Sequence, residues 1–324
     1  MPYDMLDNGL TLNNALETAI ENGSSCPICI YHIASVFGPT ANPIQTAKDN
    51  VQSAEDVVRT LDKFYQRHPH SKPRLVLTSS MAAVRATDQT PLNGKYYTHR
   101  DWNTISELSE NWGSCYQWSK AESERSAWGL VRECNERYAK EDGKSDGKEI
   151  EMIALCPSFV FGPPPPMPSK MKDATEKMAA GSSSYSLTLL NQWLNGKSPV
   201  QSRLCADVRD VAKAHVAAGT LSRLPGDDAD RRYILSTEER LSSESTAQAL
   251  RRGVERTQKN NGREISIDMS NITCDTQFTG GAIKIGEREV EASERLQHDL
   301  GVVCRPVEET MQDMAEALLY GEAF

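Results

Sequence analysis

A tyrosine and a lysine stand four residues apart in the segment Tyr116-Gln-Trp-Ser-Lys120. In a helix, this spacing puts both side chains on the same face. A free phenol has a pKa of about 10, and an adjacent ammonium group favours the phenolate and lowers that pKa. Such a pair could give a proton to, or take one from, the oxygen of a carbonyl or carbinol group.

Two serines strengthen this interpretation, because the spacing alone is also what a solvated surface helix would show. The run Arg74-Leu-Val-Leu-Thr78 is typical of a short buried strand, and Ser79 and Ser80 follow where it ends. Catalytic groups favour the carboxyl ends of strands in open α/β sheets. A serine hydroxyl there could hold the oxygen of a substrate.

Composition limits the class of protein. The chain has 324 residues, enough for one large or two modest domains, and 38% of them are hydrophobic. A net charge of −9 argues against a nucleic-acid partner. No apolar run approaches the length of a membrane span, and the first residues lack the features of a signal peptide. The eight scattered cysteines are typical of reduced thiols. We therefore expect a cytoplasmic protein without a membrane partner.

A single CxxC motif, Cys26-Pro-Ile-Cys29, is the one cysteine pattern that could indicate a metal or redox site. Neither a second pair nor a suitable histidine accompanies it. We interpret it as two packed thiols beside a strand and predict no metal site.

Periodicity predicts strands that alternate with helices. Helical spacing indicates helices near residues 12–20, 51–64, 116–138, 206–221 and 242–259, and a last helix opened by Pro306. Apolar runs indicate strands at 28–33, 75–77, 150–155 and 232–235. This order is typical of a parallel sheet covered by helices, which is an α/β fold.

Five blocks of sequence, in one order along the chain, resemble extended short-chain dehydrogenases/reductases of the NAD-dependent epimerase/dehydratase superfamily. They are most similar to the dihydroflavonol reductase and cinnamoyl-CoA reductase branch. The blocks are Tyr31-His-Ile-Ala-Ser35 (V-F-H-x-A-S), Leu75-Val-Leu-Thr-Ser-Ser80-Met-Ala-Ala-Val84 (V-F-T-S-S-x-A-A-V), Tyr116-Gln-Trp-Ser-Lys120-Ala-Glu122 (Y-x-x-S-K-x-x-A-E), Cys156-Pro-Ser-Phe-Val-Phe-Gly-Pro163 (N-P-x-x-V-x-G-P) and Asp207-Val-Arg-Asp-Val-Ala-Lys-Ala-His215 (V-D-V-R-D-V-A-x-A-H). The resemblance implies a Rossmann-like parallel sheet with helices on both faces, followed by a smaller C-terminal α+β substrate-binding part.

The resemblance also implies a catalytic trio. Tyr116 would be the general acid in carbonyl reduction or the base in alcohol oxidation. Lys120 would lower the pKa of Tyr116 and bind the nicotinamide ribose. Ser80, rather than Ser79, matches the serine that orients the substrate carbonyl.

A cofactor site is implied in the same way, for NADP or NAD, with NADPH favoured by the resemblance. Asp4 and Met5 match the pair that meets the adenine, and Asn50 matches an asparagine in N-V-x-G-T, where Ser53 replaces the glycine. The residues implied to bind the cofactor are Asp4, Met5, Ala34, Ser35, Asn50, Thr78, Tyr116, Lys120, Pro157, Ser158 and Val160. We expect Asp207, Arg209 and Asp210 to form an ion-pair network that organises the domain junction.

The chain departs from this family at one point. Members begin with a strand, then G-x-x-G-x-x-G at the start of a helix, then a second strand, and the glycines let the backbone approach the pyrophosphate. This motif does not occur in the sequence, and the glycines between Gly280 and Gly286 have the wrong place and spacing. The loss of the first strand would leave neighbouring strand edges unpaired. The chain is either an incomplete gene product or a short form with weak cofactor binding. We favour the first, because the catalytic trio is complete.

We therefore expect an incomplete dinucleotide-binding domain with the catalytic residues in 1–162. A mainly substrate-binding region would follow in 163–324, with about 200–220 returning to the first domain. The expected activity is NAD(P)-dependent reduction of a small carbonyl compound, or oxidation of the alcohol. The alternatives are a sugar-nucleotide epimerase or dehydratase, and a non-catalytic binding protein on the same fold. A homodimer would be the expected assembly, since the family often pairs through two helices.

Overall fold

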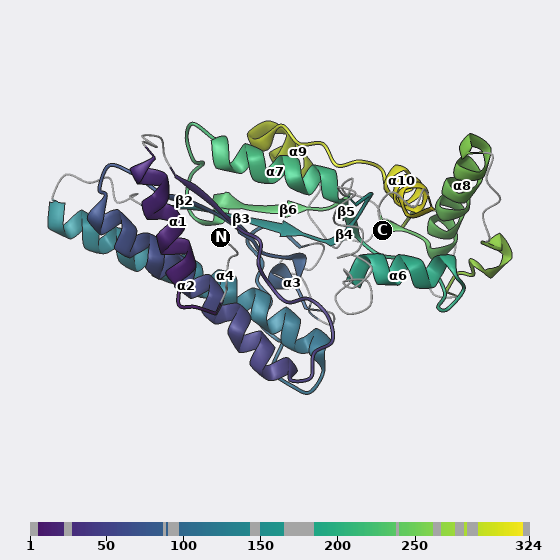
Figure 1. Ribbon diagram of the computed structural model, residues 1–324, viewed down its shortest axis with the longest axis horizontal. Helices are drawn as coiled ribbons and strands as arrows, with labels where there is room; N and C mark the ends of the chain where they lie inside the picture. The colour runs from purple at the N-terminus through teal and green to yellow at the C-terminus, as the bar shows by residue number, and fades with distance from the viewer. Residues whose placement is uncertain are drawn as a thin grey trace. The chain divides into compact units, whose positions relative to one another are not determined.

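The computed structural model describes residues 6–22, 28–86, 89, 97–142, 150–164, 185–237, 240–261, 267–275, 282–283 and 291–319 (Figure 1). These residues belong to two compact units, in each of which separate stretches of the chain come together. The first unit contains residues 1–156, 214–234 and 298–301. The second contains residues 157–213, 235–297 and 302–324.

A four-stranded sheet organises the first unit, with the strands in the order β1-β2-β3-β6. Their bounds are β1 (Cys29–His32), β2 (Arg74–Thr78), β3 (Glu151–Pro157) and β6 (Arg232–Leu235). The pairs β1–β2 and β2–β3 are parallel, with Tyr31 opposite Val76 and Leu77 opposite Ala154. Strands β2 and β3 are buried almost throughout, which explains why they are continuous apolar runs in the sequence.

Helices flank this sheet, as the alternating pattern predicted. One face is covered by α2 (Pro43–Arg67) and α4 (Trp112–Asp142), with α1 (Leu10–Glu21) packed beside α2. The apolar stripe of α2, including Leu61 and Phe64, is fully buried in a core with Leu75 of β2 and Met152 of β3. Figure 1 shows α7 (Val208–Thr220) over the opposite face of the sheet. The structure thus confirms an α/β fold with a parallel sheet between helices.

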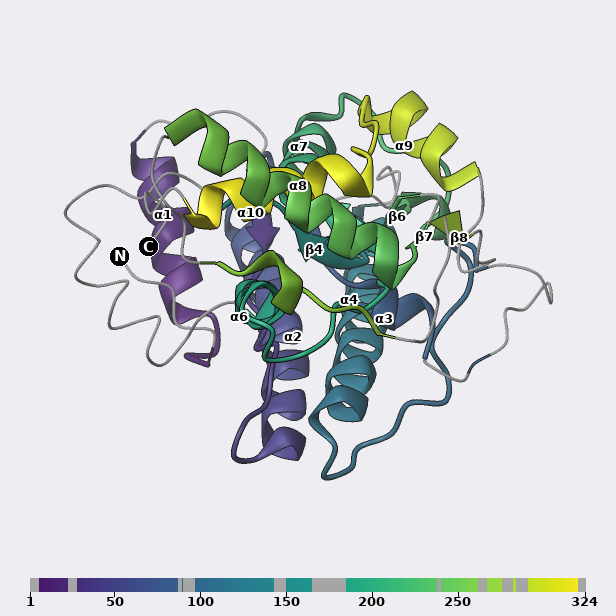
Figure 2. The same ribbon diagram turned by 90° about the vertical axis from the view of Figure 1, so that its right-hand side faces the viewer.

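The second unit is built around its own core. Strands β4 (Phe159–Phe161) and β5 (Cys205–Asp207) form a parallel pair, and β7 (Arg240–Leu241) pairs with β8 (Ala282–Ile283) antiparallel. Around them lie α6 (Tyr185–Leu194), α8 (Ser243–Asn261) and α10 (Val307–Leu319), which Figure 2 shows from the side. Leu190, Trp193, Leu250 and Met311 are almost fully buried there. Helix α9 (Glu291–Leu300) is divided between the two units.

The helix starts predicted at serine and proline residues are confirmed. Ser242 caps α8 by accepting a hydrogen bond from the Ser245 amide at 3.0 Å, and the carbonyl of Pro306 begins α10. The remaining short elements are α3 (Met81–Val84) and two 3₁₀ turns, η2 (Ala229–Arg231) and η3 (Met269–Asn271). None of the described helices is long and apolar enough to cross a membrane.

Strand β1 lies at the edge of the sheet, and no strand in the described part of the chain pairs with its outer side. Apolar side chains are exposed on and after this strand: Tyr31 is 39% exposed and Ile33 is 62% exposed. This agrees with the unpaired strand edge expected from the sequence. An open edge of this kind is a surface to which another strand can add.

Candidate active site

Ser80 lies where β2 ends and α3 begins. Its Oγ accepts a hydrogen bond from the Ala82 amide at 3.1 Å, so the hydroxyl caps the short helix. Because the oxygen is used as an acceptor, the O–H remains as a donor for another group. Ser80 is nearly buried, whereas the hydroxyl of Ser79 donates to the Glu124 carboxylate at 2.6 Å. These contacts support Ser80, rather than Ser79, as the serine that could hold a substrate oxygen.

Helix α4 carries Tyr116 and Lys120 on one face. The Lys120 ammonium lies 5.9 Å from the centre of the Tyr116 ring and donates a hydrogen bond to the Thr78 carbonyl at 3.0 Å. This bond connects α4 with the end of β2, next to Ser80. The Tyr116 ring packs against Phe37, with 4.6 Å between the ring centres. The structure therefore brings the predicted trio together within the first unit.

The pKa of Tyr116 is shifted in the direction opposite to the one predicted from the sequence. Burial of the phenol raises its pKa above the ordinary value, and a hydrogen bond from Ser80 opposes this shift. We predicted that Lys120 would lower this pKa; in the structure, desolvation of the phenolate is the larger effect and the direction is upward. A phenol with a raised pKa keeps its proton at neutral pH and remains able to donate it.

Lys120 has a lowered pKa. Its side chain is only 8% exposed, and burial lowers the pKa of its ammonium to about 8, although nearby Cys156 and Glu124 act in the opposite direction. An ammonium with this pKa changes its charge within the range in which enzymes work. Lys120 can therefore supply a positive charge next to Tyr116 below about pH 8.

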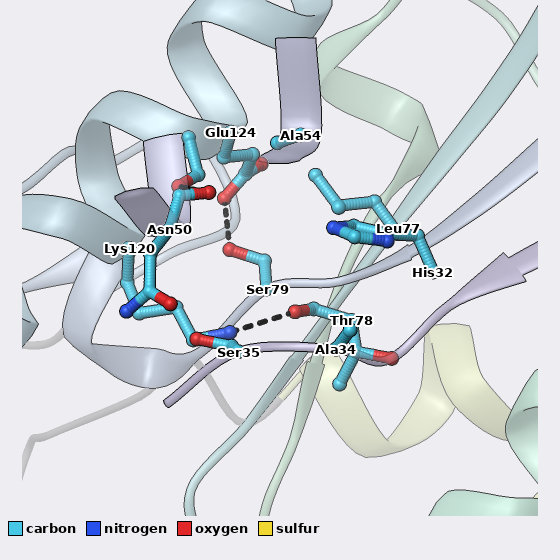
Figure 3. A pocket seen from close by; sticks show the side chains of 11 residues that line it. His32, Ala34, Ser35, Asn50, Ala54, Leu77, Thr78, Ser79, Lys120 and Glu124 are labelled. Atoms are coloured by element: carbon cyan, nitrogen blue, oxygen red, sulfur yellow. Dashed lines mark hydrogen bonds between the residues drawn. The ribbon is translucent and has the colours of Figure 1, made fainter. Parts of the chain in front are cut away.

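A small cavity of about 10 Å³ lies beside Lys120, with room for about one water molecule (Figure 3). Five of the residues implied to bind the cofactor line it. They are Ala34, Ser35, Asn50, Thr78 and Lys120. They come from the segment after β1 and from α2, β2 and α4, so the fold brings together positions that are far apart in the sequence.

Two of these residues have roles that can be stated from their contacts. Asn50 accepts a hydrogen bond from the Val36 amide at 2.9 Å and donates one to the Val36 carbonyl at 3.2 Å, which holds the segment after β1 in place. The Ser35 hydroxyl is buried and has no hydrogen-bond partner among the described residues. Ser35 thus offers a polar group to a ligand, whereas Asn50 shapes the wall of the cavity.

Glu124 also lines the cavity, and our sequence interpretation missed it. Its carboxylate is fully buried and forms an ion pair with Arg232 at 2.5 Å. A signal was present in the sequence: in the pattern Y-x-x-S-K-x-x-A-E, counting from Lys120 places the final glutamate at Glu124, not at Glu122. Glu122 instead forms an ion pair with Arg125 at the partly exposed side of α4.

Two histidines of the quoted blocks are part of the same neighbourhood. His32 lines the cavity, and burial, together with the charge of Lys120, lowers the pKa of its imidazole to about 4. His215, which ends the last of the five blocks, lies with its Nε2 2.6 Å from the Thr78 hydroxyl. The contact of His215 supports the end of β2, where the Thr78 carbonyl accepts a hydrogen bond from Lys120. Neither histidine was assigned a role from the sequence alone.

The other implied site residues lie elsewhere. Asp4 and Met5 are outside the described residues. Pro157, Ser158 and Val160 belong to the second unit, where the Ser158 hydroxyl is buried and has no partner among the described residues. Their place beside a nicotinamide stays a prediction.

The segment that begins at Asp207 forms an ion-pair network inside the second unit. Arg209 bonds to Asp207 at 2.7 Å and to Asp313 at 2.8 Å, and Asp210 pairs with Arg305. Asp207 also accepts a hydrogen bond from Thr310 at 2.9 Å, which connects β5 with α10. The expected ion-pair network is therefore present within the second unit, whereas its role at the domain junction stays a prediction. In the part of the chain that the structure describes, no cluster of three or more His, Cys, Asp or Glu residues is placed to bind a metal ion.

Comparison with known proteins shows which proteins this chain is similar to. No protein-family model matches the chain. It is 32% identical over 178 residues to the NADPH-dependent methylglyoxal reductase GRE2 of Saccharomyces cerevisiae. The aligned region covers 52% of this chain and 44% of that protein. It is 31% identical over 202 residues to an uncharacterized oxidoreductase of Schizosaccharomyces pombe, over 58% of this chain and 51% of the other. Over about half of its length, the chain is thus similar to an oxidoreductase and to an NADPH-dependent reductase.

Two solved structures share the fold of this chain. The crystal structure of yeast methylglyoxal/isovaleraldehyde reductase Gre2 with NADPH has a TM-score of 0.67 at 20% identity, covering 99% of this chain and 84% of the other. MoeE5 in complex with UDP-glucuronic acid and NAD has a TM-score of 0.56 at 16% identity, covering 98% of this chain and 84% of the other. The match to each curated relative spans only about half the length of that relative.

Proposed function

We propose that this chain carries the catalytic half of an NAD(P)-dependent reductase of small carbonyl compounds. The observation that carries the proposal is the meeting of Ser80, Tyr116 and Lys120 at the carboxyl end of β2, with the ammonium bonded to the Thr78 carbonyl. The sequence relationship to a methylglyoxal reductase supports a small aldehyde or ketone as the substrate class.

The chemistry assigned to the chain is the handling of one proton. The Ser80 O–H would hold the carbonyl oxygen, and Tyr116, whose pKa is raised by burial, would donate its proton to that oxygen. The charge of Lys120 would stabilise the phenolate that remains. Bound NAD(P)H would supply the hydride. The reverse direction, oxidation of an alcohol, would use Tyr116 as the base.

The residues present match the nicotinamide-ribose end of such a cofactor in their chemistry, and the cavity, with room for about one water molecule, would have to open to admit it. Lys120 is a buried donor, and the Ser35 hydroxyl lines the same cavity without a partner among the described residues. Both groups are of the kind that binds ribose hydroxyls. No G-x-x-G-x-x-G motif for a pyrophosphate occurs in the sequence. The proposal therefore assigns cofactor binding by this chain to the ribose end.

A Tyr116→Phe change tests the assignment of the acid. The purified chain would be assayed for NADPH oxidation with methylglyoxal and isovaleraldehyde as probes. We expect Tyr116→Phe to lower kcat by about 10²- to 10⁴-fold, because it removes the proton donor. Tyr65→Phe on α2 makes the same chemical change away from the trio and serves as the control. Wild-type kcat in Tyr116→Phe would show that Tyr116 is not the acid.

A binding protein without catalysis is the second candidate. The given sequence contains no glycine motif of the kind whose backbone provides much of the contact with a dinucleotide, so cofactor binding has to be measured directly. Such a protein would bind a small carbonyl compound or a nucleotide without turnover. Binding in the absence of NADPH oxidation, unchanged by Tyr116→Phe, would identify this case.

A further inference from the structure

Glu124 is a fully buried carboxylate on α4, four residues after Lys120. The spacing places it one helical turn further along the face that carries the catalytic side chains. A buried charge is costly unless it is paired and hydrogen-bonded. The contacts of the Glu124 carboxylate therefore indicate which groups stabilise its charge in the interior.

The partners of Glu124 come from three different strands. Its Oε1 accepts from the Arg232 Nε of β6 at 2.5 Å, and its Oε2 accepts from the Ser79 hydroxyl after β2 at 2.6 Å. The Cys156 thiol of β3 lies 3.7 Å away, and Trp128 of the same helix donates from its indole at 3.3 Å. One carboxylate thus joins α4 to the ends of the neighbouring strands.

Arg232 is fixed in turn by groups other than Glu124. It donates to the carbonyl groups of His99 at 2.7 Å and Asp101 at 2.6 Å, and its guanidinium lies 3.8 Å from the centre of the Trp102 ring. The guanidinium is therefore held on several sides, so Glu124 has little freedom to move. Because its counter-ion Arg232 is held rigidly, the Glu124 carboxylate can fix the position of helix α4.

We propose that Glu124 is a positioning residue, which holds the helix of Tyr116 and Lys120 in register with the strand end that presents Ser80. This inference rests on the proposed function of that trio. Ser79 is the direct connection, because its hydroxyl binds Glu124 while the next residue, Ser80, caps α3. A shift of about 1 Å between catalytic groups can cost about 10²-fold in rate, so such a connection has a measurable effect.

The charge of Glu124 also acts on Lys120 across the cavity that both residues line. It opposes the lowering of the Lys120 pKa that burial causes. The other ionisable groups that face this region are Arg232, which is paired with Glu124, His32 on β1, Cys156 on β3 and Tyr116 on α4. Removal of the Glu124 charge should therefore make Lys120 lose its proton at lower pH.

The test compares Glu124→Gln, which removes the charge but keeps the shape, with Glu122→Gln on the same helix as the matched control. The titration midpoint of Lys120 would be read by NMR from chains containing ¹³C-lysine, with the signal assigned by its loss in Lys120→Met. We expect a lower midpoint in Glu124→Gln and an unchanged one in Glu122→Gln. An unchanged midpoint in a folded Glu124→Gln chain would overturn the proposal.

Ser79→Ala keeps the ion pair with Arg232 and removes only the connection to the strand end. We expect kcat to fall about 10- to 100-fold with KM nearly unchanged, and the Lys120 signal to move at constant pH. A wild-type kcat, or an unmoved Lys120 signal, would overturn the proposal. This variant decides the question if Glu124→Gln does not fold. If the wild-type chain reduces no carbonyl compound, the proposed function fails, and the Lys120 signals still test the positioning role.

Discussion

At the scale of single residues, the site combines two buried basic side chains with one buried carboxylate. Lys120 and His32 line the same cavity, and burial lowers the pKa of both. The two lowered values, about 8 and about 4, lie on either side of neutral pH. Near pH 7 the lysine is therefore charged while the histidine is neutral, which avoids two like charges in one cavity.

The pKa of Lys120 predicts how the reduction depends on pH. The ammonium is present below about pH 8 and is lost as the pH rises through that value. Tyr116 keeps its proton across this range because its pKa is raised. We therefore expect kcat for carbonyl reduction to fall above about pH 8, and a pH–rate profile measures this.

Lys120→Arg provides the control for this profile, because a guanidinium stays charged throughout the range. We expect a lower kcat in this variant, since a guanidinium differs in shape from an ammonium, but no decline near pH 8. A decline at the same pH in Lys120→Arg would assign the titration to another group. Circular dichroism at each pH would separate this effect from unfolding.

His32 predicts acid sensitivity of the fold. Its folded-state pKa of about 4 lies below the ordinary 6.5, so the unfolded chain binds a proton first as the pH falls. The free energy of unfolding should therefore decrease between about pH 6.5 and 4, by on the order of 3 kcal/mol from this group. Urea unfolding at several pH values should show a smaller decrease in His32→Gln. His70→Gln, at an exposed position, should keep the wild-type decrease.

The sequence was sufficient to select Tyr116, Lys120 and Ser80, because a local spacing and a strand end mark them. It was not sufficient for the ion pair of Glu124, whose partner Arg232 is 108 residues away. It also led to the wrong direction for the pKa of Tyr116. The neighbouring charge can be seen in the sequence, whereas the extent of burial depends on the packing of Phe37 and other side chains on the phenol.

At the scale of elements, α8 and α10 of the second unit approach each other closely at Gly253 of α8. A Cβ there would lie 2.7 Å from the Gln312 carbonyl oxygen and 2.9 Å from the Ala315 Cβ of α10. We predict that Gly253→Ala destabilises the protein by about 1–3 kcal/mol, because the backbone of α10 must move. Thermal unfolding would measure this difference.

Gly129 of α4 is the matched control, since it also lies within a helix but has nothing within 4 Å of an added Cβ. Gly129→Ala should stabilise the protein by up to about 1 kcal/mol, through the better helix propensity of alanine. Opposite signs for the two changes would support close packing of α8 on α10. Equal stabilisation in both variants would contradict it.

The long helices and buried strands could be predicted because their periodicity extends over many residues. The short elements β4, β5 and β7 could not, because two or three residues carry no reliable pattern and their pairing is set by distant segments. Helix α6 was also missed. Its buried residues include Leu190 and Trp193, and the helix follows a stretch of sequence rich in proline and serine. The alternation of strands and helices that predicted the other elements is not visible there.

At the scale of the whole molecule, each unit has its own core, and the described site groups lie in the first unit. That unit includes the exposed outer edge of β1, with Tyr31 and Ile33 beside it. The proton-handling residues are therefore assembled within the first unit, and the given sequence contains no G-x-x-G-x-x-G motif for a pyrophosphate. Cofactor affinity is the property on which this arrangement has the greatest effect.

Our last prediction concerns this affinity. If Lys120 and Ser35 bind the ribose end, then NADPH, NADH and reduced nicotinamide mononucleotide should bind the 324-residue chain with similar affinities. The reason is that the contacts they share would supply the binding free energy. Fluorescence titration of the three compounds measures this, and Lys120→Met should weaken all three, while Lys63→Met on the exposed side of α2 should weaken none.

Much tighter binding of NADPH than of the mononucleotide would contradict this prediction, because it would require a site for the adenosine and phosphate groups. Competition by adenosine 2′,5′-bisphosphate would identify that site directly. Absence of binding by all three compounds, up to millimolar concentration, would contradict the assignment of Lys120 and Ser35. In that case the buried ammonium would serve the fold or another ligand, and the non-catalytic alternative would be preferred.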